Sequence, residues 1–378
     1  MTGRDHHNQY DIILIGAGFG GSAAARILAR AGKSVAIVPG AGRSRSLEAD
    51  GGLVGPDLVE SAFGAGAPLG GAVNTIRHFT APVVTGTPKF GPLETMPERR
   101  SFRRLELERW ALDRAIDAGA VFLDDFVEGR VVPSNDGGLT LVEEGEGRSI
   151  LARTIVLCEG SDPRIAMRAG LRPDYPPEEQ IHFARVILAQ PPEPIVCIGR
   201  TRTSWGMPIG VAVTPLGSVT LVTADSRIEN VMRGAKSTQD ALVDLLSSRL
   251  GGELGLHGER LHTGIELSAM RSSGRNLSMA HGGLLLGIDA SGMLDMRGVD
   301  RADITIRSGR HLGQFLVDQP TEDWDTASRE LLRQIEASDP GWHDSRKTGY
   351  IEESSSADTL KSAAFRLARG VTGRFRKG

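Results

Sequence analysis

The sequence predicts an α/β protein with a parallel sheet, an inserted domain made of an antiparallel sheet, and a helical segment at its C-terminal end. Three observations predict this class. Near the N-terminus an apolar run passes through a glycine-rich turn into an alanine-rich helix. The middle block, 166–275, consists mainly of strand patterns separated by proline and glycine. The apolar run 284–290 carries an acid near its end and precedes a helix pattern, which indicates a return to the first sheet.

The first elements of the chain form a β-α-β unit. Residues 12–15 are an apolar run that is typical of a buried parallel strand. Gly16, Gly18 and Gly21 follow with the spacing G-x-G-x-x-G and lead into the helix. In such a turn the first glycine permits the sharp bend, the second lets a pyrophosphate approach the backbone, and the third lets the helix pack on the strand. Because a second strand, 34–38, follows the helix, the context favours dinucleotide binding over a chance glycine-rich turn.

The rest of the first half reads as short elements between glycine and proline residues. The stretch 39–55 is rich in Gly, Ser and Arg and predicts a loop, whereas 66–97 predicts strand and loop in a second layer. Helix patterns are expected over 22–31, 56–65 and 104–118. Strand patterns are expected over 121–123, 128–132, 139–143 and 154–157, with a hairpin turn at 135–138.

The second half continues with strand patterns that suit an antiparallel sheet covered by a helix. The strands are expected over 182–188, 195–200, 210–214, 218–223 and 261–267, and the helix over 237–250. After them we expect a buried strand at 284–290, a helix at 302–317 and a polar, largely helical segment at 321–378.

Composition and charge exclude several classes of protein. The chain has 378 residues and a net charge of −3, so the total charge argues for no nucleic-acid partner. No apolar run approaches the length of a transmembrane helix, and the polar start does not predict a signal peptide. Cys158 and Cys197 lie in apolar strand patterns, where small buried side chains are favoured over a disulfide, and no spacing indicates a metal site. We therefore expect a cytoplasmic protein of a reducing compartment.

The order of these parts resembles the FAD-dependent FixC and geranylgeranyl reductase group. That group is related to electron-transfer-flavoprotein:quinone oxidoreductase and shares the p-hydroxybenzoate-hydroxylase architecture. The resemblance is carried by the glycine turn, by Cys158-Glu159-Gly160 with Arg-Ala-Gly-Leu at 168–171, and by the strand that ends at Asp289. It is strongest over 10–38, 104–120, 154–171 and 284–310, which is less than half of the chain.

The resemblance implies how the chain divides into domains. It implies a discontinuous, Rossmann-type FAD-binding domain made of 8–65, 98–165 and 276–320. It also implies a substrate domain made of 66–97 and 166–275, followed by a C-terminal helical tail over 321–378.

The resemblance also implies roles for single residues. The glycine turn, with Phe19 and Gly20 inside it, is implied to hold the FAD pyrophosphate, and Arg104 is implied to contact the cofactor. Asp289 is implied to place its carboxylate near the ribityl chain. The other positions implied near the cofactor are Glu159, Gly160, Asp300 and Arg301.

Three positions depart from the pattern of the group. The second strand usually ends in an acid that holds the adenosine ribose, and Pro39 stands there instead. Ile288 replaces the glycine of a Gly-Asp step, and Asp300-Arg301 replaces Glu-Gly near the flavin pyrimidine. Two readings follow from them: a working flavoenzyme with a retuned site, which we favour, or a flavoprotein-like fold whose FAD site has decayed or been reused.

The function that the resemblance implies is a flavin-dependent dehydrogenase or reductase. It would move a hydride or electrons between a small organic substrate and FAD, and exchange electrons with an external carrier. Pro163 stands where aromatic hydroxylases carry serine, which favours the dehydrogenase side. An FAD-dependent monooxygenase, and a non-redox protein that uses a degenerate FAD-binding fold, remain the alternatives. No residue is assigned a catalytic role.

Two further segments carry hypotheses about partners. Trp205 and Met207 are candidates for the wall of a substrate pocket, and the alternative is that they fill the core between sheet and helix. The segment 360–377 has a basic amphipathic pattern that is typical of weak contact with a membrane surface. The alternative for this segment, which we favour, is a solvated helix that packs one apolar stripe on the body of the protein, or a frayed end broken by Gly370 and Gly373.

Overall fold

The computed structural model describes the chain in segments. The described residues are 9–40, 51–126, 129–134, 138–143, 148–159, 164–169, 180–190, 193–227, 231–269, 280–281, 284–286, 301–318 and 333. The chain divides into a unit of residues 1–332 and a unit of residues 333–378. All helices and strands named below belong to the first unit.

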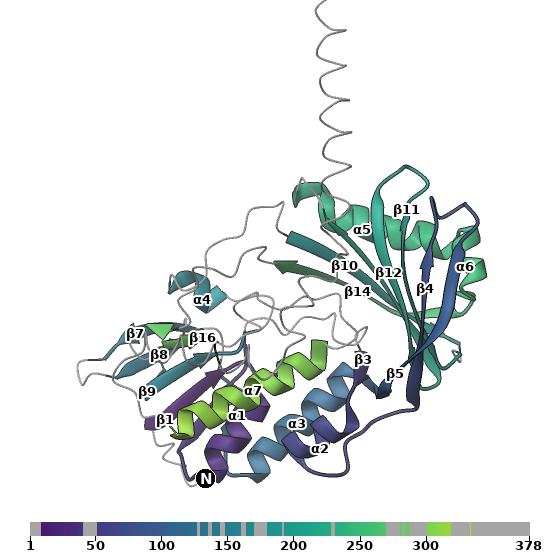
Figure 1. Cartoon of the computed structure of the whole chain (residues 1–378). Helices are drawn as coiled ribbons and strands as arrows, with labels where there is room; N and C mark the ends of the chain where they lie inside the picture. Colours follow the sequence, from purple (N-terminus) through teal and green to yellow (C-terminus); the bar gives the residue numbers. More distant parts are fainter. Residues whose placement is uncertain are drawn as a thin grey trace, which may run out of the picture. The chain divides into compact units, whose positions relative to one another are not determined.

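The first sheet, sheet A, is mainly parallel and carries the N-terminal β-α-β unit (Figure 1). Its strand order is β15-β16-β9-β1-β2-β6, and the hairpin β7-β8 continues from β9. The strands are β1 (Gln9–Ile15), β2 (Val35–Val38), β6 (Val121–Phe122), β7 (Gly129–Pro133), β8 (Leu139–Glu143), β9 (Ser149–Leu157), β15 (Ala280–His281) and β16 (Leu284–Leu286). Strand β1 lies between β2 and β9, and Ile13 and Leu14 are fully buried, as the continuous apolar run predicts for a central parallel strand.

Helices from three distant parts of the chain pack together beside sheet A (Figure 1). They are α1 (Phe19–Arg30), α2 (Pro56–Phe63), α3 (Arg104–Asp117) and α7 (Arg301–Asp318). Small residues let α1 and α7 approach each other closely, because a Cβ atom added at Gly309 would lie 2.2 Å from the carbonyl oxygen of Gly20. Helix α7, which begins 271 residues after the end of α1 (301 − 30), therefore packs on the N-terminal β-α-β unit.

The second sheet, sheet B, is antiparallel except where β11 pairs in parallel with β4. Its strand order is β14-β10-β13-β12-β11-β4-β5-β3. The strands are β3 (Gly51–Val54), β4 (Ala72–Thr80), β5 (Lys89–Arg103), β10 (Gln180–Ala189), β11 (Ile195–Arg202), β12 (Pro208–Leu216), β13 (Val219–Arg227) and β14 (Glu259–Ala269). Helices α5 (Val231–Leu246) and α6 (Arg249–Glu253) cover one face, with Leu242, Leu245 and Leu250 in the apolar core below them.

These elements confirm the predicted fold class, a parallel-rich sheet with helices and an inserted antiparallel sheet. The prediction that 39–55 is a loop is wrong at its end, because 51–54 form β3, which pairs with the end of β5. The sequence did not predict this strand because Gly51 and Gly52 weaken the strand pattern. The same glycines allow close packing on Phe102. The predicted domain boundaries remain a prediction, although β3 and residues 98–103 belong to sheet B.

Some expectations fall outside the described part of the chain. They are the turn at 135–137, Asp289 in the strand 284–290, and the C-terminal segment with its basic amphipathic pattern at 360–377. Within the described residues, no helix combines the length and the apolar character needed to span a bilayer.

Candidate dinucleotide site

The glycine turn lies where the carboxyl ends of three parallel strands meet. Gly16 follows β1, and its N–H donates a 2.9 Å hydrogen bond to the carbonyl of Val38 at the end of β2. Gly16 has φ of +115°, and a Cβ atom there would lie 2.0 Å from the carbonyl oxygen of Cys158 at the end of β9. Only glycine fits this backbone, because the position combines a left-handed conformation with a neighbour that leaves no room for a side chain.

The start of α1 carries backbone N–H groups without a side-chain cap. A Cβ atom at Gly21 would lie 2.0 Å from the carbonyl oxygen of Gly16, so the helix packs directly on the turn. Gly18 precedes the helix and has no side chain to cap it, and the first turn contains no acid. The backbone N–H groups of this turn, with the positive end of the helix dipole, are suited to bind a phosphate group.

The end of β2 forms the neighbouring wall of this site. Gly40 packs against the turn, since a Cβ atom there would lie 3.5 Å from the Cα of Gly16 and 3.7 Å from the Cα of Glu159. Pro39, between β2 and Gly40, is half-buried and supplies no carboxylate. Pro39, which stands in place of the usual acid, therefore lies beside the glycine turn.

The start of α3 also reaches the glycine turn. Arg104 is the first residue of α3, and its Nε donates a 2.8 Å hydrogen bond to Oε1 of Glu108 one turn later. The same oxygen lies 3.4 Å from the position of a Cβ atom at Gly18. The side chains of Arg104 and Glu108 are 21% and 14% exposed, so this ion pair is largely shielded from solvent. Sequence reasoning found Arg104 and missed Glu108, although the i,i+4 spacing of opposite charges was the available signal.

Glu159 is buried and its carboxylate binds the start of a helix. Its two oxygens accept hydrogen bonds from the N–H groups of Ile165 at 2.9 Å and Ala166 at 3.0 Å. These residues open α4 (Arg164–Arg168), so the acid stabilises both the unpaired donors and the positive end of the helix dipole. Glu159 therefore fixes the chain where it leaves β9.

A second buried acid was not found from the sequence. Asp303, in the first turn of α7, accepts a 2.9 Å hydrogen bond from the N–H of Gly55 and forms an ion pair with Arg99 of β5. The side chain of Asp303 is 3% exposed. It joins the start of α7 to the end of β3 and to β5. An acid in the first turn of a predicted helix was the only signal, and it did not reveal the partner two hundred residues earlier.

The structure brings together only part of the predicted site. The glycine turn, Arg104 and Glu159 lie around the ends of β1, β2 and β9, whereas Arg301 begins α7 and only its backbone is described. Outside the described residues lie Gly160, Asp289, Asp300 and Ile288.

The two candidates for a substrate pocket lie at the turn between β11 and β12. Trp205 is 53% exposed, and Met207 packs against the apolar core under α5. The turn is held by Asp244 of α5, which accepts hydrogen bonds from the N–H and the hydroxyl of Ser204. Met207 thus lies where the core-filling alternative places it, and a role of either residue in a substrate pocket remains a prediction.

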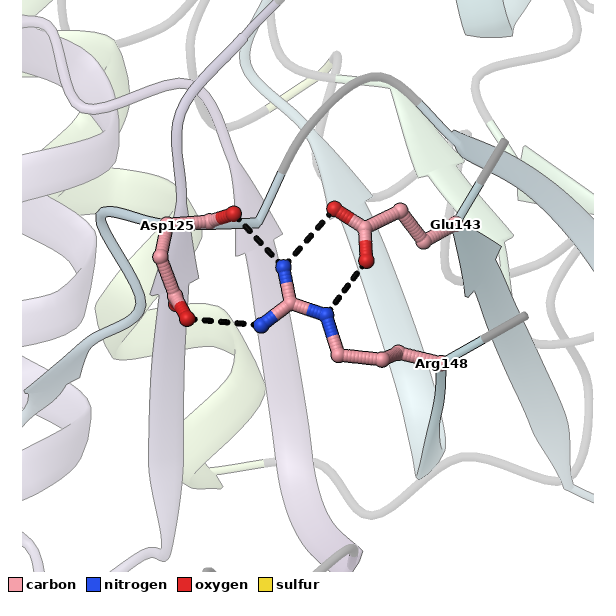
Figure 2. A network of polar contacts seen from close by, with 3 residues as sticks. All are labelled: Asp125, Glu143 and Arg148. Atoms are coloured by element: carbon pink, nitrogen blue, oxygen red, sulfur yellow. Dashed lines mark hydrogen bonds and ion pairs between the residues drawn. The ribbon is translucent and has the colours of Figure 1, made fainter. Parts of the chain in front are cut away.

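Figure 2 shows a polar cluster of Asp125, Glu143 and Arg148 whose charged groups bind one another. Arg148, the residue before β9, pairs with both oxygens of Glu143 on β8 and donates 2.6 Å hydrogen bonds to Asp125 Oδ2 and to the Asp125 carbonyl. Hydrogen bonds to Glu143 and Asp125 raise the pKa of Arg148 above its ordinary value. The cluster joins the antiparallel strands β8 and β9 to the segment after β6, and its opposite charges pair with one another. Across the described parts of the chain, no group of three or more His, Cys, Asp and Glu side chains is placed to hold a metal ion.

Comparison with known proteins supports the resemblance expected from the sequence. No family model matches the chain. Protein FixC of Escherichia coli K12 is 27% identical over 169 residues, which are 43% of this chain and 39% of FixC. FixC of Shigella flexneri matches with the same identity and coverage. The matched region is thus well under half the length of these curated relatives.

Solved structures with a similar fold cover most of the chain. A geranylgeranyl bacteriochlorophyll reductase-like protein from Thermoplasma acidophilum has a TM-score of 0.67 and 17% identity, over 87% of this chain and 84% of its own. The flavin-dependent halogenase CmlS has a TM-score of 0.66 and 14% identity, over 89% and 64%. A flavoprotein/dehydrogenase from Cytophaga hutchinsonii has a TM-score of 0.61 and 17% identity, over 89% and 86%. At these identities the likeness establishes the fold, which this chain shares with flavoproteins of several activities.

Proposed function

We propose that the chain is a flavin-dependent oxidoreductase of the FixC and geranylgeranyl reductase type. In this proposal FAD lies across the start of α1, and the protein moves a hydride or electrons between FAD and a small organic substrate. The observation that carries the proposal is the glycine turn, where three strand ends meet and Gly16 and Gly21 leave no room for side chains. The FixC similarity and the flavoprotein fold support the same conclusion.

The residues of the turn fit the pyrophosphate of FAD. The backbone from Gly16 to Gly21 and the N–H groups of the first turn of α1 would hold the phosphates. Arg104 and Glu108 lie at the edge of this turn as an ion pair, so the guanidinium would meet the phosphates with its charge largely offset by the carboxylate. Phe19 is buried and anchors the start of α1 in the apolar core between α1, α2 and α7.

The chemistry of the reaction would come from the flavin when it is bound, since an isoalloxazine ring carries hydride and single electrons. The residues of the chain would bind and orient it. The proposed positions for the remaining contacts are Asp289 near the ribityl chain and Asp300 with Arg301 near the pyrimidine ring. Sheet B would supply the substrate side, and Trp205 and Met207 remain proposed for the pocket there.

The proposed partners follow from this chemistry. They are an organic substrate and an external electron carrier, and the basic segment at 360–377 is proposed for weak contact with a membrane surface.

Pro39 favours a second candidate function, a non-redox protein that uses a degenerate FAD-binding fold, because the usual ribose contact is missing.

Flavin content and reducibility of the purified full chain test the proposal. The protein is titrated with FAD while flavin fluorescence is followed, and the saturated complex is then reduced anaerobically by light or dithionite. We expect binding to saturate at one FAD per chain and the bound flavin to accept electrons. A folded protein that leaves FAD fluorescence unchanged at all concentrations would contradict the proposal. One bound FAD that cannot be reduced would support the non-redox alternative.

A further inference from the structure

The end of β2 is placed to meet the adenosine half of a dinucleotide. Ile15 pairs with Val38 in the parallel register, and the N–H of Gly16 binds the carbonyl of Val38. Position 39 therefore follows β2 at the same edge of the sheet as the glycine turn. Gly40 then lies against the backbone of Gly16 and Glu159.

The side chain at this position cannot bind a ribose. In dinucleotide-binding β-α-β units an acid at the end of the second strand accepts hydrogen bonds from the ribose hydroxyl groups. Pro39 has neither a polar side-chain atom nor a backbone N–H. The loss of a hydrogen bond to a charged acceptor lowers the affinity for the adenosine half by about tenfold to one-hundredfold.

The phosphate end of the site does not compensate for this loss with an unshared positive charge. Glu108 brings a carboxylate to the edge of the turn at Gly18, where the pyrophosphate of the ligand would pass. Arg104 offsets the repulsion from this carboxylate, because its Nε lies 2.8 Å from Glu108 Oε1. The ion pair therefore presents little net charge to the phosphates. Most of the remaining binding comes from backbone N–H groups at the start of α1.

We propose that FAD is an exchangeable ligand of this chain and that Pro39 is the cause. In this proposal FAD binds and dissociates on the timescale of purification. This inference rests on the proposed function, because it assumes that FAD is the dinucleotide at the turn. The consequence is that the fraction of active protein follows the concentration of free FAD. The missing acid is then a determinant of occupancy, and the phosphate turn is still intact.

A gain of affinity is the sharpest test, since a misfolded variant cannot produce it. The dissociation constants of FAD, ADP and FMN are measured by fluorescence or calorimetry for the full-length wild type, Pro39→Glu and Pro39→Ala. We expect the wild type to lose FAD on desalting and to rebind it on titration. Pro39→Glu should bind FAD and ADP at least about tenfold more tightly, because a ribose acceptor is restored. FMN lacks the adenosine half, so its affinity should not change.

Pro39→Ala is the matched control, because it removes the proline ring and adds no carboxylate. It should bind all three ligands as the wild type does. Pro39→Asp serves as the second acid variant where circular dichroism or a thermal melt shows that Pro39→Glu is not folded.

The outcomes separate this inference from the proposed function. Stoichiometric FAD that stays with the wild type through long dialysis would overturn the inference and leave the proposed function standing. Equal FAD affinities of the wild type, the folded acid variants and Pro39→Ala would also overturn it. Folded proteins that bind no FAD at any concentration would end both the proposed function and the inference.

Discussion

At the scale of single residues, Gly16 carries the largest steric constraint in the candidate site. Its φ of +115° lies in the region that side chains rarely adopt, and the carbonyl oxygen of Cys158 occupies the place of a Cβ atom. Gly71 provides the contrast, because a Cβ atom there would meet nothing within 4 Å and its φ is ordinary. The two positions separate a glycine that the backbone requires from one that it does not.

We therefore predict that Gly16→Ala lowers the free energy of unfolding by roughly 2–4 kcal/mol through backbone strain and the clash with β9. The affinity for FAD and ADP should fall with it, because the turn can no longer place its N–H groups. Denaturant unfolding and ligand titration of the full chain measure the two effects. Gly71→Ala should change the free energy of unfolding by less than about 0.5 kcal/mol. Equal stabilities of the two variants would show that Gly16 tolerates a side chain.

His311 predicts how stability depends on pH. Burial, and then the charges of Arg310 and Arg307, lower the pKa of His311 on α7 below its ordinary value. As the pH falls through about 6.5, the unfolded chain binds a proton at this position before the folded protein does. The folded state therefore loses stability below that pH and keeps it above.

Unfolding midpoints in urea at several pH values from neutral to mildly acidic test this dependence. We expect the stability difference between wild type and His311→Asn to decrease as the pH falls, because only the wild type carries this destabilising protonation. Gly71→Ala, at an exposed position without a titratable group, is the control, and its stability difference from the wild type should stay constant over this pH range. A difference between wild type and His311→Asn that stays constant between neutral and acidic pH would contradict the assignment to His311.

At the scale of elements, the sequence predicted what local patterns encode. The apolar runs of β1 and β9 and the glycine turn are visible in the chain because a parallel strand buried on both faces requires an uninterrupted apolar run. Strand β3 was not visible, since two of its four residues are glycine and its partner, β5, lies about fifty residues further along the chain. Glycine carries no side-chain pattern, and pairing over that distance depends on packing.

The candidate site divides in the same way. The role of the glycine turn follows from covalent geometry, which is local. The use of Glu159 as the cap of α4, and of Glu108 as the partner of Arg104, depends on how side chains turn after folding. The contact of Asp303 with Gly55 and Arg99 joins residues that are more than two hundred positions apart, and a single sequence carries no signal for it.

Asp303 gives the prediction at this scale. Asp303→Asn should lower the free energy of unfolding by about 2 kcal/mol or more, because Arg99 then lies next to a neutral amide and the bonds from Gly55 and Arg99 lose their charged acceptor. Urea unfolding measures the change. The control is Glu253→Gln in the exposed pair with Arg249, where the N–O distance is 3.6 Å and less than about 0.5 kcal/mol is expected. Equal effects of both variants would mean that the Asp303 contact contributes no more than a surface ion pair.

At the scale of the whole molecule, α7 couples the two ends of the first unit. Gly309 and Gly313 of α7 lie on Gly20 and Ala24 of α1, so backbone meets backbone at the crossing. Gly20 is also part of the glycine turn. We therefore expect a displacement of α7 to reach the candidate dinucleotide site through Gly20.

Gly309→Ala tests this coupling. A Cβ atom at position 309 would lie 2.2 Å from the carbonyl oxygen of Gly20, so α7 must move outward, at a cost of about 1–3 kcal/mol in the free energy of unfolding. Because Gly20 lies in contact with α7 and belongs to the glycine turn, the turn should shift with the helix, and the dissociation constant of ADP should rise as well. Gln314→Ala, on the exposed side of the same helix, should leave both quantities unchanged, within about 0.5 kcal/mol for unfolding. If Gly309→Ala lost stability and bound ADP as tightly as the wild type, the crossing would hold the fold together without shaping the site.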